Sequence, residues 1–187
     1  MVKEINMGTK CKFKNGWQIF SGTPMMVSAG GNILTNQQLV SSTTETAVLS
    51  ETIYANTFDS TSMCFRVFIA GEISGFGGTA DCTLILNYGA TDILAIELTD
   101  IDAEDDKPFK CEWTGHVLTT GVTGKIVCTA FASVMSAAPN YYATDVALTG
   151  VTVDLTAAGS LNVTADWDAS HASNDIIVTH GWIELYN

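Results

Sequence analysis

Acidic residues crowd one segment of the chain in a way that could support metal binding. The run DIDAEDD, Asp100–Asp106, places five carboxylates within seven residues. Carboxylate oxygens are the ligands that calcium prefers in proteins. The run lacks the glycine and the distal glutamate of an EF-hand loop, and Ile101 and Ala103 interrupt it. We therefore expect a solvated acidic loop, and calcium binding stays open as the alternative.

A second group of possible metal ligands lies near the end of the chain. Asp166 and Asp168 share one face of a predicted strand, His171 lies in the loop that follows, and His180 lies in the last predicted strand. A zinc site needs three or four ligands that converge. These side chains would converge only if the two strands paired closely. We expect them to be loop and surface residues, and we predict no metal and no cofactor.

Signatures of enzymatic catalysis are not found in the sequence. It contains no GxSxG motif, no P-loop and no dinucleotide fingerprint. Three aromatic residues, Trp113, Tyr141 and Tyr142, lie close to predicted turns, where they could stack on sugars. We expect core filling or subunit contact as their use, and they are our candidate ligand-binding residues as the alternative. We predict a protein that is not an enzyme.

Composition indicates a folded domain with an unevenly distributed charge. Of the 187 residues, 47% are hydrophobic and 15% are charged, and the formal net charge is −12. Residues 1–14 hold four lysines against Glu4, a balance of +3, so the other 173 residues carry −15. An acidic body argues against nucleic acid as a partner. No window is long and apolar enough for a membrane helix, and residues 1–10 lack the apolar core of a signal peptide.

The cysteines do not indicate a disulfide framework. There are five, an odd number, and no CxxC motif occurs. Four of them fall within predicted strands. We expect them to be reduced and buried as small hydrophobic residues, in keeping with folding in a reducing cytosol.

Residues 43–187 show the pattern of an all-β domain. About nine short runs of β-favouring residues alternate with turns rich in glycine, asparagine and serine, and no convincing helix is found. The clearest alternation runs from Met63 to Ile73, whose odd-numbered residues are predicted to face the core. The pattern predicts an antiparallel β-sandwich or barrel. Residues 1–42 are less regular, and we interpret them as an N-terminal arm or adaptor.

The last two predicted strands are interpreted as a C-terminal hairpin. They are Leu161–Trp167 and Ile176–Tyr186, joined by a polar loop. The last strand has apolar residues on both faces, so a second surface must cover one of them, either residues 1–40 or a neighbouring subunit. This is the physical basis for predicting a homo-oligomer. The predicted subunit interface consists of Ile176, Val178, His180, Trp182 and Tyr186.

Two short motifs resemble those of a known protein family. Ile53–Thr57 (IYANT) is similar to an I-P-A-N-T turn, with Tyr54 in place of the usual proline, and Leu84–Gly89 (LILNYG) is similar to an L-x-L-x-F-G strand. Together with Asp166–Tyr186, they resemble small jelly-roll proteins of tailed bacteriophages, of the virion structural, head-decoration or tail-appendage type. The resemblance covers roughly residues 43–187.

The resemblance implies an antiparallel β-sandwich with jelly-roll topology, often trimeric. It implies a virion structural protein, made in the host cytoplasm, that acts by self-association and attaches to other virion proteins through residues 1–42. The alternative is a receptor- or carbohydrate-binding β-sandwich module, with a host-surface glycan as its partner. Neither function needs nucleic acid or a membrane.

Overall fold

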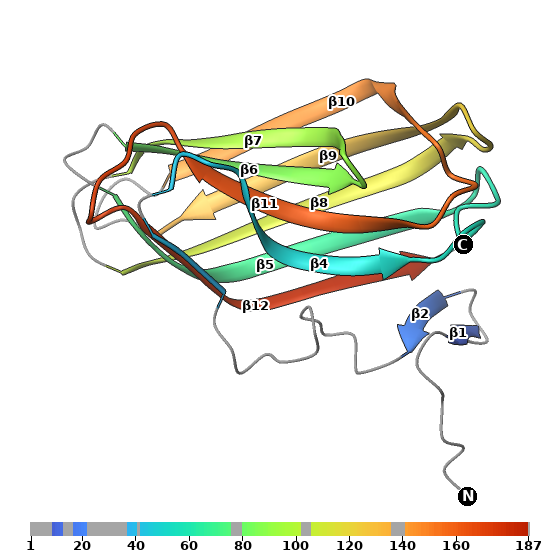
Figure 1. The fold of residues 1–187 in the computed structure, drawn as a ribbon, viewed down its shortest axis with the longest axis horizontal. Helices are drawn as coiled ribbons and strands as arrows, with labels where there is room; N and C mark the ends of the chain where they lie inside the picture. The colour runs from blue at the N-terminus through green and yellow to red at the C-terminus, as the bar shows by residue number, and fades with distance from the viewer. Residues whose placement is uncertain are drawn as a thin grey trace, which may run out of the picture.

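The computed structural model describes residues 9–12, 17–21, 37–40, 42–75, 80–101, 106–135 and 141–186. This part of the chain contains twelve strands and no helix, so it has no helical segment that could cross a membrane (Figure 1). The strands are β1 (Thr9–Lys12), β2 (Trp17–Ser21), β3 (Gln37–Val40), β4 (Thr46–Ile53), β5 (Cys64–Ser74), β6 (Ala80–Tyr88), β7 (Thr91–Ile101), β8 (Lys107–Thr119), β9 (Gly124–Val134), β10 (Tyr141–Val153), β11 (Gly159–Trp167) and β12 (Asp175–Tyr186).

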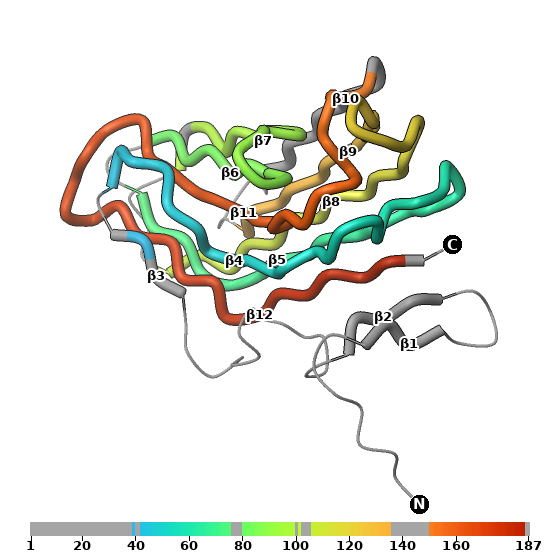
Figure 2. The backbone as a smooth tube through the Cα atoms, turned by 45° about the vertical axis from the view of Figure 1, so that its right-hand side comes forward, coloured from blue at the N-terminus to red at the C-terminus, as the bar shows by residue number. Residues whose placement is uncertain are grey.

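The strands form two antiparallel sheets that pack as a sandwich, which confirms the predicted fold class. The larger sheet has the order β1-β2-β12-β5-β8-β9-β10, with β3 also paired to β12, and the smaller sheet has the order β4-β11-β6-β7. Figures 1 and 2 show these sheets as two layers. The four-strand sets β3-β12-β5-β8 and β4-β11-β6-β7 have the strand order of a jelly roll. The β9–β10 hairpin extends the larger sheet beyond it.

Because strand β3 belongs to the sandwich, the sandwich begins before residue 43, the start predicted from the sequence. Its residues pair with the first half of β12, from Val40↔Asp175 to Gln37↔Val178. Leu39 is buried in the core. The first strand of the jelly roll therefore lies within residues 1–42, the segment that we interpreted as an arm.

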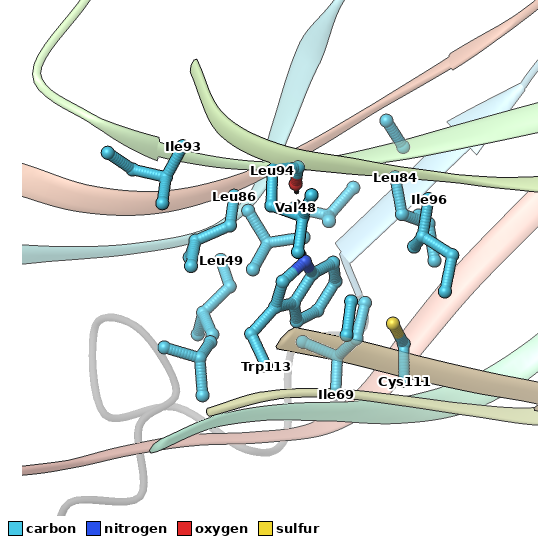
Figure 3. Close-up of a cluster of buried hydrophobic side chains, with 14 of the residues drawn as sticks. Val48, Leu49, Ile69, Leu84, Leu86, Ile93, Leu94, Ile96, Cys111 and Trp113 are labelled. Carbon is cyan, nitrogen blue, oxygen red and sulfur yellow. Dashed lines mark hydrogen bonds between the residues drawn. The ribbon is translucent and has the colours of Figure 1, made fainter. Parts of the chain in front are cut away.

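The core fills the space between the sheets with side chains at alternate positions. In β5 the inward residues are the predicted odd-numbered ones, and all of Leu161, Val163, Ala165 and Trp167 in β11 are buried. Trp113 of the larger sheet lies at the centre, and its indole N–H donates a hydrogen bond of 3.3 Å to the carbonyl of Leu94 in the smaller sheet (Figure 3). This bond ties the two layers together in an apolar environment.

The prediction of a C-terminal hairpin is wrong. β11 pairs with β4 and β6 in the smaller sheet, whereas β12 pairs with β5, β3 and β2 in the larger one. The polar loop between them crosses from one layer to the other. Both strands bury an apolar face. Two strands that face each other across the core bury these faces as well as two strands that pair in one sheet.

Both motifs behind the family resemblance contain a turn with a left-handed residue. Asn56 has a φ of 57° and Gly89 a φ of 61°. The Thr57 N–H donates to the Tyr54 carbonyl across the first turn, at 3.1 Å. Asparagine and glycine tolerate positive φ better than other residues do. The motifs therefore record the backbone conformation of two turns.

Three of the cysteines are buried in the sandwich, as predicted, and a fourth is not. Cys82, Cys111 and Cys128 lie in the core, whereas Cys64 is only half-buried. Burial raises the pKa of all three core thiols, that of Cys128 to about 12. The side chain of Cys11 lies outside the described residues.

Thiol labelling should separate these residues. In a Cys11→Ser variant at pH 8, we expect iodoacetamide to modify Cys64 in the folded protein and the core cysteines only after unfolding, because alkylation requires an exposed thiolate. Peptide mass spectrometry measures this directly. Fast modification of Cys128 in the native protein would contradict the placement of β9.

Candidate binding surface

An aromatic pair lies on the outer face of the larger sheet. Phe68 of β5 points away from the core because its neighbours in sequence, Val67 and Ile69, point into it. Trp182 of β12 is its register partner. The two rings are stacked, with centroids 5.3 Å apart and planes at 17°. Such pairs contribute about 0.5–1.5 kcal/mol beyond their buried area.

A charged pair adjoins these rings. The guanidinium carbon of Arg66 lies 4.9 Å from the centroid of the Trp182 ring, within the range of a cation–π contact. The same guanidinium forms a salt bridge with Glu112 of β8. The side chains of Arg66 and Glu112 are 41% and 32% exposed, so water screens the pair and its contribution to stability is small. The salt bridge holds the two charged groups at fixed positions beside the rings.

The register extends this surface across four strands. Trp182 pairs with Phe68, Phe68 with Glu112, and Glu112 with Phe131 of β9. Phe131 is 39% exposed, so its ring is open to solvent on this face. We call Trp182, Phe68, Glu112 and Phe131, together with Arg66, the aromatic row. It combines apolar rings with one cation and one carboxylate, a mixture suited to binding and lacking an evident nucleophile.

A β-bulge in β12 corrects the predicted subunit interface. The register passes from Val178↔Gly71 to His180↔Ala70, which leaves Thr179 as an extra residue. A bulge of this kind reverses the faces on which the following side chains lie. Ile176 and Val178 are therefore buried in the core, on the same face as Ile183 and Leu185. The assignment of Ile176 and Val178 to a subunit interface is wrong.

Two of the other three predicted interface residues lie on the outer face of the larger sheet. His180 is exposed and Trp182 is half-buried, both on the outer face. The backbone of Tyr186 pairs with Trp17 and Cys64, and its side chain lies outside the described residues. The apolar character of both faces of β12 thus has a local cause. Among the predicted interface residues whose side chains are described, Trp182 is the apolar residue that still supports a contact surface.

The predicted ligand-binding residues do not form one site. Trp113 is wholly buried, which confirms core filling as its use and excludes it as a ligand-binding residue. Tyr141 and Tyr142 begin β10, where their backbones pair with Val134 and Ser133. Their side chains lie outside the described residues, so their part in ligand binding stays a prediction.

The two candidate metal sites have different outcomes. Residues 102–105 of the acidic run lie outside the described residues, so calcium binding there stays an open alternative. Asp166 lies on the outer face of the smaller sheet and His180 on the outer face of the larger one, so these side chains cannot converge. Across the described ranges, no group of three or more histidine, cysteine, aspartate or glutamate residues could hold a metal ion.

The outer face of the smaller sheet is polar and acidic. Glu45 accepts hydrogen bonds from Thr164 Oγ1 and from Asn87 Nδ2, the latter at 2.9 Å. Asp166 lies near them, and its Oδ1 is buried without a hydrogen-bond partner among the described residues. Burial raises the pKa of the Asp166 carboxyl, and the negative charge of Glu45 raises it further. This face accumulates negative charge that it does not neutralise.

Asp166→Asn should therefore stabilise the protein at neutral pH. A carboxyl whose folded pKa is raised has its ionised form destabilised by folding, so the penalty is full above the folded pKa and absent below the ordinary value of 3.8. We expect a gain below about 1 kcal/mol at pH 7, because solvent screens this partly exposed group. Urea denaturation at pH 7 and pH 3 measures it.

Asp168→Asn is the matched control. Asp168 Oδ1 accepts a hydrogen bond of 3.0 Å from the Asp81 N–H. Replacing Asp168 should lower stability at pH 7 or leave it unchanged. If the Asp166 and Asp168 variants behaved alike, the burial of Asp166 would not be the cause.

Most of the aromatic row was not identified from sequence. Arg66, Phe68, Glu112 and Phe131 were not singled out, although the alternation of β5 already placed Phe68 opposite the core. A large aromatic residue on the outward face of a confidently alternating strand was the available signal. The pairing of Phe68 with Trp182 depends on which strands are neighbours, and this was not known.

Comparison with known proteins identifies no family for this chain. No protein-family model matches it, and no curated protein matches it. Among solved structures, the CBM2 module of an evolved Dit protein from Lactobacillus casei BL23 phage J-1 is similar, at 14% identity, over 88% of this chain and 79% of that one. The TM-score of 0.33 is too low for this similarity to support a shared fold or function.

Proposed function

We propose that this protein is a non-enzymatic structural component of a bacteriophage virion, of the head-decoration or appendage type, that acts by attachment and self-association. The observation that carries the proposal is the jelly-roll strand order. The fold implied by the sequence resemblance is the fold observed, and the motif residues Asn56 and Gly89 both occupy turn positions with positive φ.

Attachment to the particle is assigned to the residues before the sandwich. Among the described residues of the predicted arm, β3 pairs with the jelly roll along four residues of β12. β2 pairs with two residues at the end of β12, Leu185 and Tyr186. The charge of +3 on residues 1–14, against −15 on the rest, suits this segment for an acidic surface on a particle protein.

Deletion variants test the attachment. Removing residues 1–36 keeps β3, so we expect the variant to fold with nearly unchanged thermal stability and to be lost from purified particles in a complementation assay. Removing residues 1–42 also removes β3 and should destabilise the sandwich. Incorporation of the 1–36 deletion at the wild-type level would refute the tether.

A receptor- or carbohydrate-binding module is the second candidate function. The half-buried Trp182 and the 39% exposed Phe131 favour it, because exposed aromatic rings can stack on sugars. A glycan array with the full chain tests this. Binding that is lost in Trp182→Ser would support it, whereas no binding together with unchanged adsorption of particles carrying that variant would exclude it.

A further inference from the structure

We propose that the outer face of the larger sheet, centred on the aromatic row, is the surface through which two copies of this chain associate. This inference rests on the self-association in the proposed function and names the surface that performs it. The smaller sheet is the alternative surface, and the charge of the two sheets favours the larger one.

The charge of the chain is distributed unequally between the sheets. The four cationic residues after residue 14 are Arg66, Lys107, Lys110 and Lys125, and all lie in β5, β8 and β9 of the larger sheet. Strands β5, β8, β9, β10 and β12 hold these four against five carboxylates, a balance of −1. Strands β4, β6, β7 and β11 hold six carboxylates and no lysine or arginine, a balance of −6.

This difference in charge favours association through the larger sheets over association through the smaller sheets. Two copies of an acidic chain repel each other, and contact through the smaller sheets would bring strands of −6 against −6. Contact through the larger sheets brings −1 against −1. A two-fold interface places the same patch on both copies, so each residue meets a surface that also contains its own counterpart. Arg66 of one copy can then approach carboxylates of the second, because both Arg66 and Glu112 are partly exposed.

The composition of the aromatic row fits the centre of such an interface. Tryptophan, phenylalanine and arginine are enriched at the buried centres of protein interfaces, and they account for much of the binding free energy. The row supplies Trp182, Phe68 and Phe131 in one line with Glu112 across four strands, and Arg66 lies beside that line against the Trp182 ring. Polar residues surround it, among them the exposed Thr114, Thr129 and His116.

The size of the face also fits a second copy. β5, β8 and β9 have 11, 13 and 11 residues, so they extend over about 36–43 Å at roughly 3.3 Å per residue. Five neighbouring strands about 4.8 Å apart span roughly 24 Å. The face therefore offers about 900 Å², close to the roughly 800 Å² per partner that a specific interface buries.

Sedimentation velocity of the full chain over a range of concentrations tests the inference. We expect wild type to self-associate reversibly, and more strongly at higher salt, because salt screens the repulsion between acidic chains. Phe131→Glu and Trp182→Ser should weaken association by about tenfold or more. Ala95→Glu adds one carboxylate at an exposed position on the outer face of the smaller sheet, and it should have no effect. Circular dichroism confirms that each variant is folded.

The outcomes distinguish this inference from the function on which it rests. A wild-type chain that stays monomeric at all concentrations overturns both the interface and the self-association. An oligomer that persists unchanged in Phe131→Glu and Trp182→Ser overturns the interface alone. A monomeric chain that binds a glycan through Trp182 overturns the interface in favour of the second candidate function.

Discussion

Replacing Gly71 with alanine is expected to lower the free energy of unfolding by about 3 kcal/mol or more, at or beyond the upper end of overpacking costs. A Cβ atom at Gly71 would lie 1.8 Å from the carbonyl oxygen of Ile177 and 2.9 Å from its carbonyl carbon. These are backbone atoms of β12, which cannot rotate away as a side chain can. Urea denaturation monitored by tryptophan fluorescence measures the change.

Gly181→Ala is the matched control for this substitution. Gly181 lies in β12 itself, and the nearest atom to its Cβ would be a side-chain methyl of Leu49, 3.2 Å away. That methyl can shift by a few tenths of an ångström, so we expect a cost below about 1 kcal/mol. Equal costs at the two glycines would mean that β12 does not approach β5 as closely as described.

The close approach at Gly71 coincides with the bulge in β12. Gly71 pairs with Val178, and the next pair, Ala70 with His180, omits Thr179. The Thr179 hydroxyl donates to the Ala70 carbonyl at 3.3 Å. The absence of a side chain at Gly71 makes room for β12 to shift across at this point. Gly71→Ala therefore also tests the arrangement that returns Ile183 to the core.

The second large effect is expected at the tryptophan between the sheets. Trp113→Ala should cost about 3–5 kcal/mol, because it empties a fully buried volume at the centre of the core. Trp113→Phe should still destabilise, because it leaves a smaller cavity and removes the hydrogen bond to the Leu94 carbonyl. Thermal and urea denaturation provide both values.

Trp167→Phe is the control that isolates the hydrogen bond. Trp167 is as fully buried as Trp113, but no described group accepts a hydrogen bond from its indole nitrogen. Replacing it removes an unsatisfied buried donor, so we expect Trp167→Phe to cost less than Trp113→Phe. If Trp113→Phe left stability unchanged and abolished binding of a ligand, that result would contradict the burial of Trp113 at the centre of the core.

Much of the fold could be predicted from local sequence patterns. The alternation from Met63 to Ile73 identifies which side of β5 faces the core, and the residues from Leu161 to Trp167 do so for β11. Both patterns reflect the period of two that any half-buried strand imposes. The turn residues Asn56 and Gly89 follow equally from local backbone geometry.

The errors have a common physical cause in non-local structure. The bulge at Thr179 reverses the faces of β12, and it depends on the close approach to Gly71, more than 100 positions earlier in the chain. The assignment of β11 and β12 to different sheets depends on their other partners. Alternation is equally satisfied by a hairpin and by a crossing between layers, so it could not distinguish them.

The candidate site, like the fold, could be predicted from local sequence patterns only in part. The outward orientation of Phe68 follows from the pattern of β5, whereas β9 has apolar residues on both faces, so its pattern does not indicate on which side Phe131 lies. Their alignment with Trp182 and Glu112 follows from three strand registers between segments far apart in the sequence. A single sequence contains no direct record of those registers.

The central claim, that this chain is a virion component, is tested most directly by mass spectrometry of purified particles. Residues 126–187 contain no lysine or arginine, so trypsin leaves this segment uncut, and chymotrypsin or an Asp-specific protease is the better choice. We predict peptides from residues 43–187 in gradient-purified particles, at multiple copies per particle. Peptides found in the lysate of infected cells but absent from the particles would contradict the claim.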